Sequence, residues 1–417
     1  MIVTRLKLAN VRAIESVEFR FQPGFNLIVG VNGEGKTSVL DSLSVCLSAV
    51  VKHTNKLRNP VESFSVDDIR VRGDALMVEC EVQIRQWTYT YLVHHPRETS
   101  APQKRKVGMP REQVHETPER QEFEGAPPKL ATGKEPEGRP LAVLFSTRRA
   151  VPSQRAPAKG ASAGGFASAY ADAFVDRELR LGEFAAWMRV QKALRKERPA
   201  SARVLTALEE AVKRFLPNYS NLRVNGDKLP KLLIDYKKCT LEVRQLSDGE
   251  RGSLALVFDL TRRLAQANPH LSDPARLAEA VVLIDEIDLH LHPKWQREIV
   301  RNLTTAFPKC QFVATTHSPQ VIGEVQRERI QIIAKGEVYS PPQSFGVDSS
   351  RVLEEIMDAD PRTEEIQDLL GKLSRAVGNA KYKLARNLLV KLASQVGQND
   401  PEVTRTETLL EFIGQEG

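Results

Sequence analysis

The stretch that decides how this chain folds reads Phe25-Asn-Leu-Ile-Val-Gly30-Val-Asn-Gly-Glu-Gly35-Lys-Thr-Ser38. Its first five residues are an apolar run of the kind that a buried parallel strand needs. Gly30 to Thr37 match the pattern G-x-x-x-x-G-K-[ST], and apolar residues recur at helical spacing behind the match. A strand, a glycine-rich loop and a helix in this order form a cradle for phosphate groups. The alternative, an ordinary glycine-rich turn, does not explain why strand and helix flank the loop.

The cradle predicts that the chain binds a nucleotide, with ATP and Mg²⁺ as the ligands. Lys36 is expected to reach the β- and γ-phosphates, and the Thr37 hydroxyl is expected to hold Mg²⁺. Backbone N–H groups of the loop and the positive end of the following helix supply further contacts to the phosphates. The residues expected to bind the nucleotide in this loop are Gly30, Asn32, Gly33, Glu34, Gly35, Lys36, Thr37 and Ser38.

Composition narrows the class of protein. The chain has 417 residues and a net charge of +7, which permits nucleic acid as a partner. Its four cysteines are scattered and form no C-x-x-C pair, a pattern typical of free, buried thiols in a reducing compartment. No apolar run has the length of a bilayer crossing and no signal-peptide pattern is present. We therefore expect a cytoplasmic protein that does not bind a membrane.

The order of patterns along the chain predicts five parts. The second part holds 8 of the chain's 24 prolines and almost no aliphatic residues, so we expect a flexible surface insertion there. The third part begins with a strand and continues in basic helices, which are either a solvated face or a binding patch. The last part favours four helices, near 350–357, 362–377, 379–396 and after Pro401. The five parts are an N-terminal lobe at 1–95, the insertion at 96–140, a strand with a helical lid at 141–220, a C-terminal lobe at 221–346 and a helical region at 347–417.

Acidic residues and a histidine follow two further buried strands. Asp285 and Glu286 come directly after the apolar run Ala280–Ile284, and His317 follows the run that starts at Phe312. Ligands gather at the carboxyl ends of parallel strands. Asp285 is expected to help bind Mg²⁺, and Glu286 to orient and deprotonate the water that attacks the γ-phosphate. His317 is expected to contact the γ-phosphate or to hold this water.

Together these motifs resemble the ABC-type ATPases of the SMC and RecF class. Leu246-Ser-Asp-Gly-Glu250 is similar to their signature motif, Thr315-Thr-His317-Ser-Pro to their switch histidine, and Asn10-Val-Arg12 to an early motif whose arginine leans over the nucleotide. The resemblance implies an α/β fold. We expect an ABC-ATPase head, that is, a P-loop NTPase with a mixed sheet, helices and N-terminal antiparallel strands. A helical lid insertion and a C-terminal helical region would complete it.

The resemblance also implies a composite site. In this family the signature serine binds the γ-phosphate held by the other subunit, so we expect a homodimer or a higher oligomer of heads. Ser247, Asp248, Gly249 and Glu250 would then contact the nucleotide across the interface. The glutamine loop has only a weak candidate, Gln154. His290 and His292 have metal-like spacing, but a loop and a helix start explain them better than a zinc site.

Two biological roles stay open at this stage. The stretch Ser349-Ser-Arg-Val-Leu-Glu-Glu-Ile-Met357 and the helices after it resemble Septu and retron-associated defence ATPases, which partner an HNH-type nuclease. The alternative is a RecF-like repair ATPase that acts on DNA directly. The sequence has no evident nuclease motif, so we expect a separate nuclease subunit as partner.

Overall fold

The computed structural model describes residues 1–55, 57, 61–97, 120–124, 138–150, 165–176, 178–179, 181–226 and 230–415. The chain forms two compact units, Met1–Ser349 and Ser350–Gly417. The first unit contains three sheets and the motifs described above. Its architecture confirms the predicted α/β class with a largely parallel sheet and N-terminal antiparallel strands.

A six-stranded sheet forms the centre of the first unit. The strands lie in the order β14-β13-β3-β12-β11-β7, and all neighbours are parallel except β13 and β14. Every residue of β3, β11 and β12 is buried, as expected for parallel strands covered on both faces. The bounds are β3 (Phe25–Val29), β7 (Leu141–Phe145), β11 (Ala280–Ile284), β12 (Cys310–Thr316), β13 (Ile330–Ala334) and β14 (Glu337–Tyr339).

A second, antiparallel sheet contains most of the N-terminal strands, in the order β2-β1-β4-β5-β6. β4 and β5 form a hairpin that turns at Arg85-Gln86. Within the predicted flexible insertion at 96–140, strand β6 pairs with β5; most of the insertion lies outside the described residues. The strands are β1 (Ile2–Val11), β2 (Ile14–Arg20), β4 (Ala75–Ile84), β5 (Trp87–Pro96) and β6 (Arg120–Glu124).

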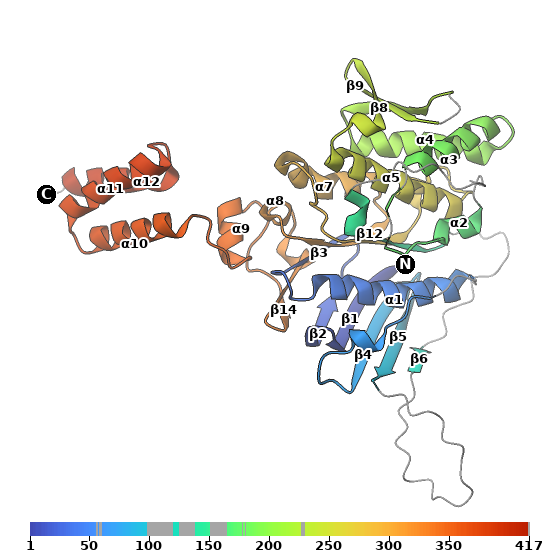
Figure 1. Ribbon diagram of the computed structural model, residues 1–417, viewed down its shortest axis with the longest axis horizontal. Coiled ribbons are helices and arrows are strands. Elements are labelled where there is room, and N and C mark those ends of the chain that lie inside the picture. Colours follow the sequence, from blue (N-terminus) through green and yellow to red (C-terminus); the bar gives the residue numbers. More distant parts are fainter. Residues whose placement is uncertain are drawn as a thin grey trace, which may run out of the picture. The chain divides into compact units, whose positions relative to one another are not determined.

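Helix α1 (Lys36–Asn55) packs between these two sheets (Figure 1). It contacts β1 and β4 on one side and β7, β11 and β12 on the other. Most of its side chains are buried, including Val39, Leu43 and Leu47. Because α1 is fixed on both sides, the phosphate loop at its N-terminus is held at the edge of the central sheet.

Helices and a small sheet cover the opposite side of the central sheet (Figure 1). The short helix α2 has five residues. The small sheet has three strands in the order β10-β9-β8. The elements are α2 (Phe166–Tyr170), α3 (Leu181–Leu194), α4 (Pro199–Phe215), β8 (Tyr219–Val224), β9 (Leu232–Tyr236), β10 (Cys239–Glu242), α5 (Asp248–Ala267), α6 (Pro274–Leu277), α7 (Pro293–Ala306) and α8 (Pro319–Ile322).

The C-terminal region has four helices close to their predicted positions, α9 (Ser349–Glu355), α10 (Glu364–Gly378), α11 (Tyr382–Val396) and α12 (Pro401–Gln415). In the second unit, α10, α11 and α12 pack around a small apolar core that includes Leu373, Leu392 and Leu410. Within the described ranges, no helix has both the length and the apolar character that a bilayer crossing requires. All four cysteines are free; Cys239 is exposed, against the expectation of burial, and the other three are buried.

Candidate nucleotide-binding site

The phosphate loop, residues 30–35, joins the end of β3 to the start of α1. Gly33 and Gly35 have φ of +91° and +97°, a left-handed conformation that glycine adopts at no steric cost. A Cβ atom on Gly30 would lie 2.6 Å from the carbonyl oxygen of Ile333, so the loop runs directly against β13. The path of the loop therefore requires glycine at these three positions.

Lys36 folds back over this loop. Its Nζ donates to the carbonyl oxygens of Gly30 (2.7 Å) and Val31 (3.1 Å). Burial lowers the pKa of Lys36, and the carboxylates of Asp285 and Glu286 act in the opposite direction. A buried ammonium group beside a loop of backbone N–H donors is suited to a polyphosphate.

Asp285 lies at the end of β11, close to the start of α1. Its carboxylate accepts from the Thr37 hydroxyl at 3.4 Å and from the Thr315 hydroxyl at 2.7 Å. These three residues meet because β3, β12 and β11 are parallel neighbours whose carboxyl ends share one edge. A hydroxyl and a carboxylate in this position match the oxygen ligands that Mg²⁺ prefers.

Glu286 begins the loop after β11 in an unusual backbone conformation. Its φ is +46°, which is uncommon for a residue with a side chain. Its N–H donates to Thr315 Oγ1 (2.8 Å), and the next N–H, of Ile287, donates to the Thr315 carbonyl (2.9 Å). The hydroxyl of Thr316 donates to the Asp288 carboxylate. The loop that carries the two acidic residues is thus fastened to the end of β12.

His317 follows β12 and is half-buried. Burial lowers its pKa, as does the positive charge of Lys36, whereas Asp288, Glu286 and Asp285 act in the opposite direction. The net shift of the His317 pKa is downward, which favours the neutral imidazole. The structure brings His317 to the same edge as the phosphate loop and the two acidic residues.

The signature residues lie on another element, α5. Exposed Ser247 caps this helix: its hydroxyl accepts from the Glu250 N–H (3.4 Å), and the Glu250 carboxylate accepts from the Ser247 N–H (3.0 Å). The Tyr219 hydroxyl also donates to the Glu250 carboxylate (2.6 Å). This capping box is visible in the sequence as S-x-x-E, and it occupies the carboxylate that was expected to contact nucleotide.

The start of α5 packs tightly on the loop after β11. A Cβ atom on Gly249 would lie 2.4 Å from the carbonyl oxygen of His290, so this contact excludes any larger residue without a backbone shift. Asp248 forms an ion pair with Arg251 of the same helix. The signature and the acidic loop of one chain are therefore joined through backbone contact.

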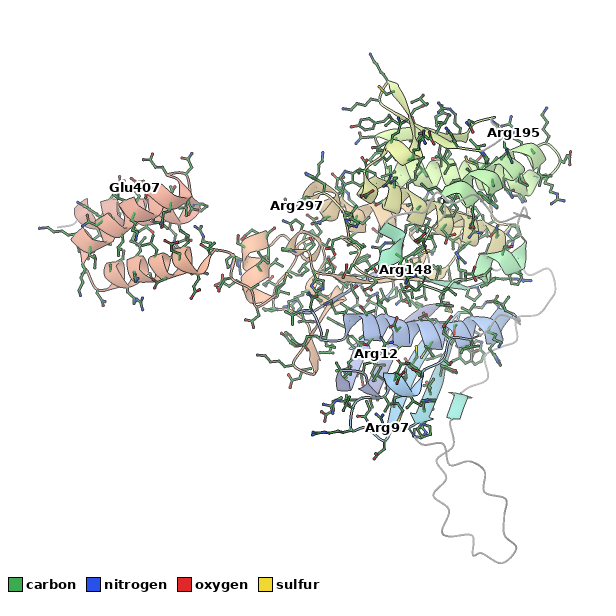
Figure 2. The ribbon with its side chains drawn as sticks, in the orientation of Figure 1. Arg12, Arg97, Arg148, Arg195, Arg297 and Glu407 are labelled. Atoms are coloured by element: carbon green, nitrogen blue, oxygen red, sulfur yellow. The ribbon has the colours of Figure 1, made fainter. Side chains whose placement is uncertain are left out.

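Arg12 lies in the turn between β1 and β2, near α1 (Figure 2). Its guanidinium forms ion pairs with Asp41 of α1 (2.6 Å) and with Asp68 (2.9 Å). Its N–H also donates to the Asp68 carbonyl (2.7 Å). Both carboxylates hold the arginine beside the first turns of α1, and its expected contact with the nucleotide stays a prediction.

Arg149 was not among the residues singled out from the sequence. It follows β7 and is only 6 % exposed. Its guanidinium donates to the carbonyl oxygens of Asp285 and Glu286, the two acidic residues of the site. The sequence signal was weak, since two arginines follow this strand and nothing distinguishes the buried one.

Two further expectations concern side chains outside this cluster. Within the part of the chain that the structure describes, no group of three or more histidine, cysteine, aspartate or glutamate side chains could hold a metal ion. His292 instead caps α7 by accepting from the Lys294 N–H (3.3 Å), which agrees with the loop and helix-start interpretation. Gln154 lies outside the described residues.

Comparisons with known proteins match two parts of the chain. A family model described as "AAA domain" matches residues 5–124, and one described as "AAA domain, putative AbiEii toxin, Type IV TA system" matches 169–323. The retron Ec83 probable ATPase of Escherichia coli is 37 % identical over 217 residues. The Septu protein PtuA of Bacillus mycoides is 46 % identical over 78 residues. The chain is thus similar to AAA-domain family models over two of its parts and to proteins of retron and Septu systems.

The matches cover limited shares of the relatives. The retron match spans 51 % of this chain and 39 % of the Escherichia coli protein, and the Septu match spans 19 % and 10 %. A solved SMC head, bound to the C-winged helix domain of ScpA, aligns with a TM-score of 0.47 at 15 % identity, over 82 % of this chain and 97 % of that one. The chain is similar to these retron and Septu proteins but spans only 39 % and 10 % of their lengths.

Proposed function

We propose that the chain binds ATP with Mg²⁺ and hydrolyses it to ADP and phosphate. The observation that supports this most is the meeting of Lys36, Thr37, Asp285 and Glu286 at one edge of the central sheet. Lys36 neutralises charge on the β- and γ-phosphates. Thr37 and Asp285 would hold Mg²⁺, which withdraws charge from the phosphates when it is bound.

Glu286 is the proposed general base. Its carboxylate accepts a proton from water as the water oxygen bonds to the γ-phosphorus and the bond to the ADP oxygen breaks. His317 can donate a hydrogen bond from its imidazole N–H to the γ-phosphate. The proposal assigns charge neutralisation, metal binding and proton transfer to separate side chains.

Lys36→Ala is expected to weaken ATP binding about 10- to 100-fold, because charge-assisted hydrogen bonds contribute roughly 1.5–3 kcal/mol each. Isothermal titration calorimetry with Mg·ATP measures this loss. Lys52→Ala is the matched control, since Lys52 lies near the other end of the same helix. Equal ATP affinity in Lys36→Ala and the wild type would contradict the proposed role of the loop.

We propose further that two heads close on ATP, each giving its α5 N-terminus to the nucleotide of the other. Ser247 is exposed at the start of a 20-residue helix, where the dipole and free N–H groups favour an anion. Ser247 caps α5, whereas the phosphate loop leads into α1, so the two belong to separate elements of one head. Hydrolysis would then open the pair and convert phosphate chemistry into movement.

We propose that this switch controls a separate effector in anti-phage defence, an HNH-type nuclease being the favoured one. The similarity to retron and Septu proteins supports this role. Co-expression with the products of the neighbouring genes is expected to yield a stable complex with a nuclease. A head that purifies alone, from a locus of replication genes, would instead favour the repair role.

Direct action on DNA is the alternative, and one feature favours it. From Trp187 to Arg214 the chain carries eight Lys or Arg against three Asp or Glu. These residues lie on α3, on α4 and in the short connection between the two helices, where Arg195 is exposed (Figure 2). A basic helical pair of this kind suits the phosphate backbone of DNA.

A further inference from the structure

We propose that Arg149 positions Glu286 for hydrolysis by binding the peptide carbonyls at the end of β11. The proposal rests on the ATPase function proposed above. The guanidinium of Arg149 binds backbone carbonyl oxygens, so it acts through the backbone of the two acidic residues. It is a positioning residue for the reaction.

The path of the chain brings Arg149 to this place. β7 is the parallel neighbour of β11, with Phe145 opposite Ile284, and the Asp285 N–H donates to the Phe145 carbonyl (2.9 Å). A short 3₁₀ turn, η2 (Thr147–Ala150), then folds back over the end of β11. Arg149 is the third residue of this turn, so its side chain reaches under the acidic loop.

The planar guanidinium of Arg149 binds the acidic loop through both of its terminal nitrogens. Nη2 donates to the Glu286 carbonyl (2.7 Å), and Nη1 donates to the carbonyls of Asp285 and Ser146, the latter at 2.8 Å. Two successive carbonyls of the acidic loop are thus bound by two nitrogens of one rigid group. A lysine has one nitrogen on a flexible chain and does not reproduce this arrangement.

The backbone conformation of Glu286 explains why these contacts of Arg149, which we call the clamp, are needed. Its φ of +46° turns the chain sharply out of the strand direction, a conformation that surroundings must maintain in a residue with a side chain. Thr315 binds the N–H of Glu286 from one side (2.8 Å), and Arg149 binds its carbonyl from the other. Both peptide groups of Glu286 are therefore fixed, and with them the direction in which its side chain leaves the backbone.

The positive charge of Arg149 stabilises its contact with the acidic loop. Burial lowers the pKa of Arg149 to about 10, while Asp285, Asp288 and Glu286 act in the opposite direction. The group stays protonated at neutral pH. It places a positive charge close enough to interact with the carboxylates of Asp285, Asp288 and Glu286.

Arg149→Lys tests the proposal, with Arg148→Lys as the matched control. Arg148 is the preceding residue, and its side chain is 63 % exposed in a surface ion pair with Asp176 (2.9 Å; Figure 2). Arg149→Lys is expected to lower kcat about 10- to 100-fold, because a small displacement of a reacting group has an effect of this size. ATP affinity should stay near the wild-type value, and Arg148→Lys should match the wild type in both measurements. In a Glu286→Gln background, Arg149→Lys should cause little further loss of turnover.

Hydrogen exchange of the nucleotide-free protein provides a readout that does not depend on ATPase activity. Arg149→Lys should speed exchange in peptides covering residues 285–289 while β12 stays protected. Unchanged exchange and unchanged kcat would overturn the proposal. Should exchange rise in a protein whose wild type has no ATPase activity, the clamp would stand and the proposed function would fail. If Arg149→Lys does not fold, Arg149→Gln replaces it; loss of folding in both would overturn the positioning role in favour of a purely structural one.

Discussion

Glu286→Gln is expected to lower the rate of ATP hydrolysis about 10³-fold, because the amide cannot accept the proton of the attacking water. The substitution keeps the size of the side chain. It also leaves the backbone bonds to Thr315 and Arg149 in place, so the acidic loop should keep its shape. Binding of Mg·ATP, measured by calorimetry, should therefore stay close to the wild-type value while single-turnover phosphate release almost stops.

Glu337→Gln is the matched control for this experiment, since Glu337 is an exposed glutamate on the edge strand β14. It should leave both binding and turnover unchanged. Glu286→Gln should in addition accumulate as an ATP-bound dimer, detectable by sedimentation velocity, because closure precedes the step that is blocked. Normal turnover by Glu286→Gln would mean that another group at this edge accepts the proton of the attacking water. His317 would be the first candidate to test.

The sequence was sufficient to predict the features that depend on local pattern or on the order of the strands. The apolar run at 25–29, the loop glycines and the helix that follows are contiguous in the sequence. Their structure could therefore be predicted from one short stretch. Asp285 and His317 are separated by about thirty residues, yet each follows a buried parallel strand. Because the carboxyl ends of such strands share an edge, their meeting could be predicted without a structure.

Contacts made by backbone atoms could not be predicted from the sequence. Arg149 binds carbonyl oxygens, and every residue has one. The residue types in the acidic loop therefore do not indicate that an arginine binds there. The close approach of Gly249 to His290 likewise depends on how α5 packs, and a glycine at a helix start has several explanations. Strand β6 lies in a stretch poor in apolar residues, where pairing with β5 outweighed composition.

Ser247→Asp is expected to lower turnover as far as Glu286→Gln does, because its carboxylate would repel the γ-phosphate of the opposite head. Ser247→Asn is the matched control, since asparagine and aspartate are both favourable N-caps and differ here in charge. The pair separates loss of the helix cap from loss of the anion site. ATP affinity of the single head should change little in either variant, because Lys36 and the phosphate loop belong to α1. Ser247→Asn should retain more turnover and more ATP-dependent association than Ser247→Asp.

Mixing Lys36→Ala with Ser247→Asp tests whether the site is shared. In a mixed dimer, one site joins the intact Lys36 of one head to the intact Ser247 of the other, and the second site carries both changes. If the two sites fire independently and subunits exchange freely, random pairing in a twofold dimer predicts recovery to about one quarter of wild-type turnover. Recovery requires complementation between chains, which a self-contained head cannot give. Heads that associate without recovering turnover would mean that both sites must fire together. An enzyme that is active while strictly monomeric over the assay concentrations would overturn the composite site, because Ser247 would then have no phosphate to bind.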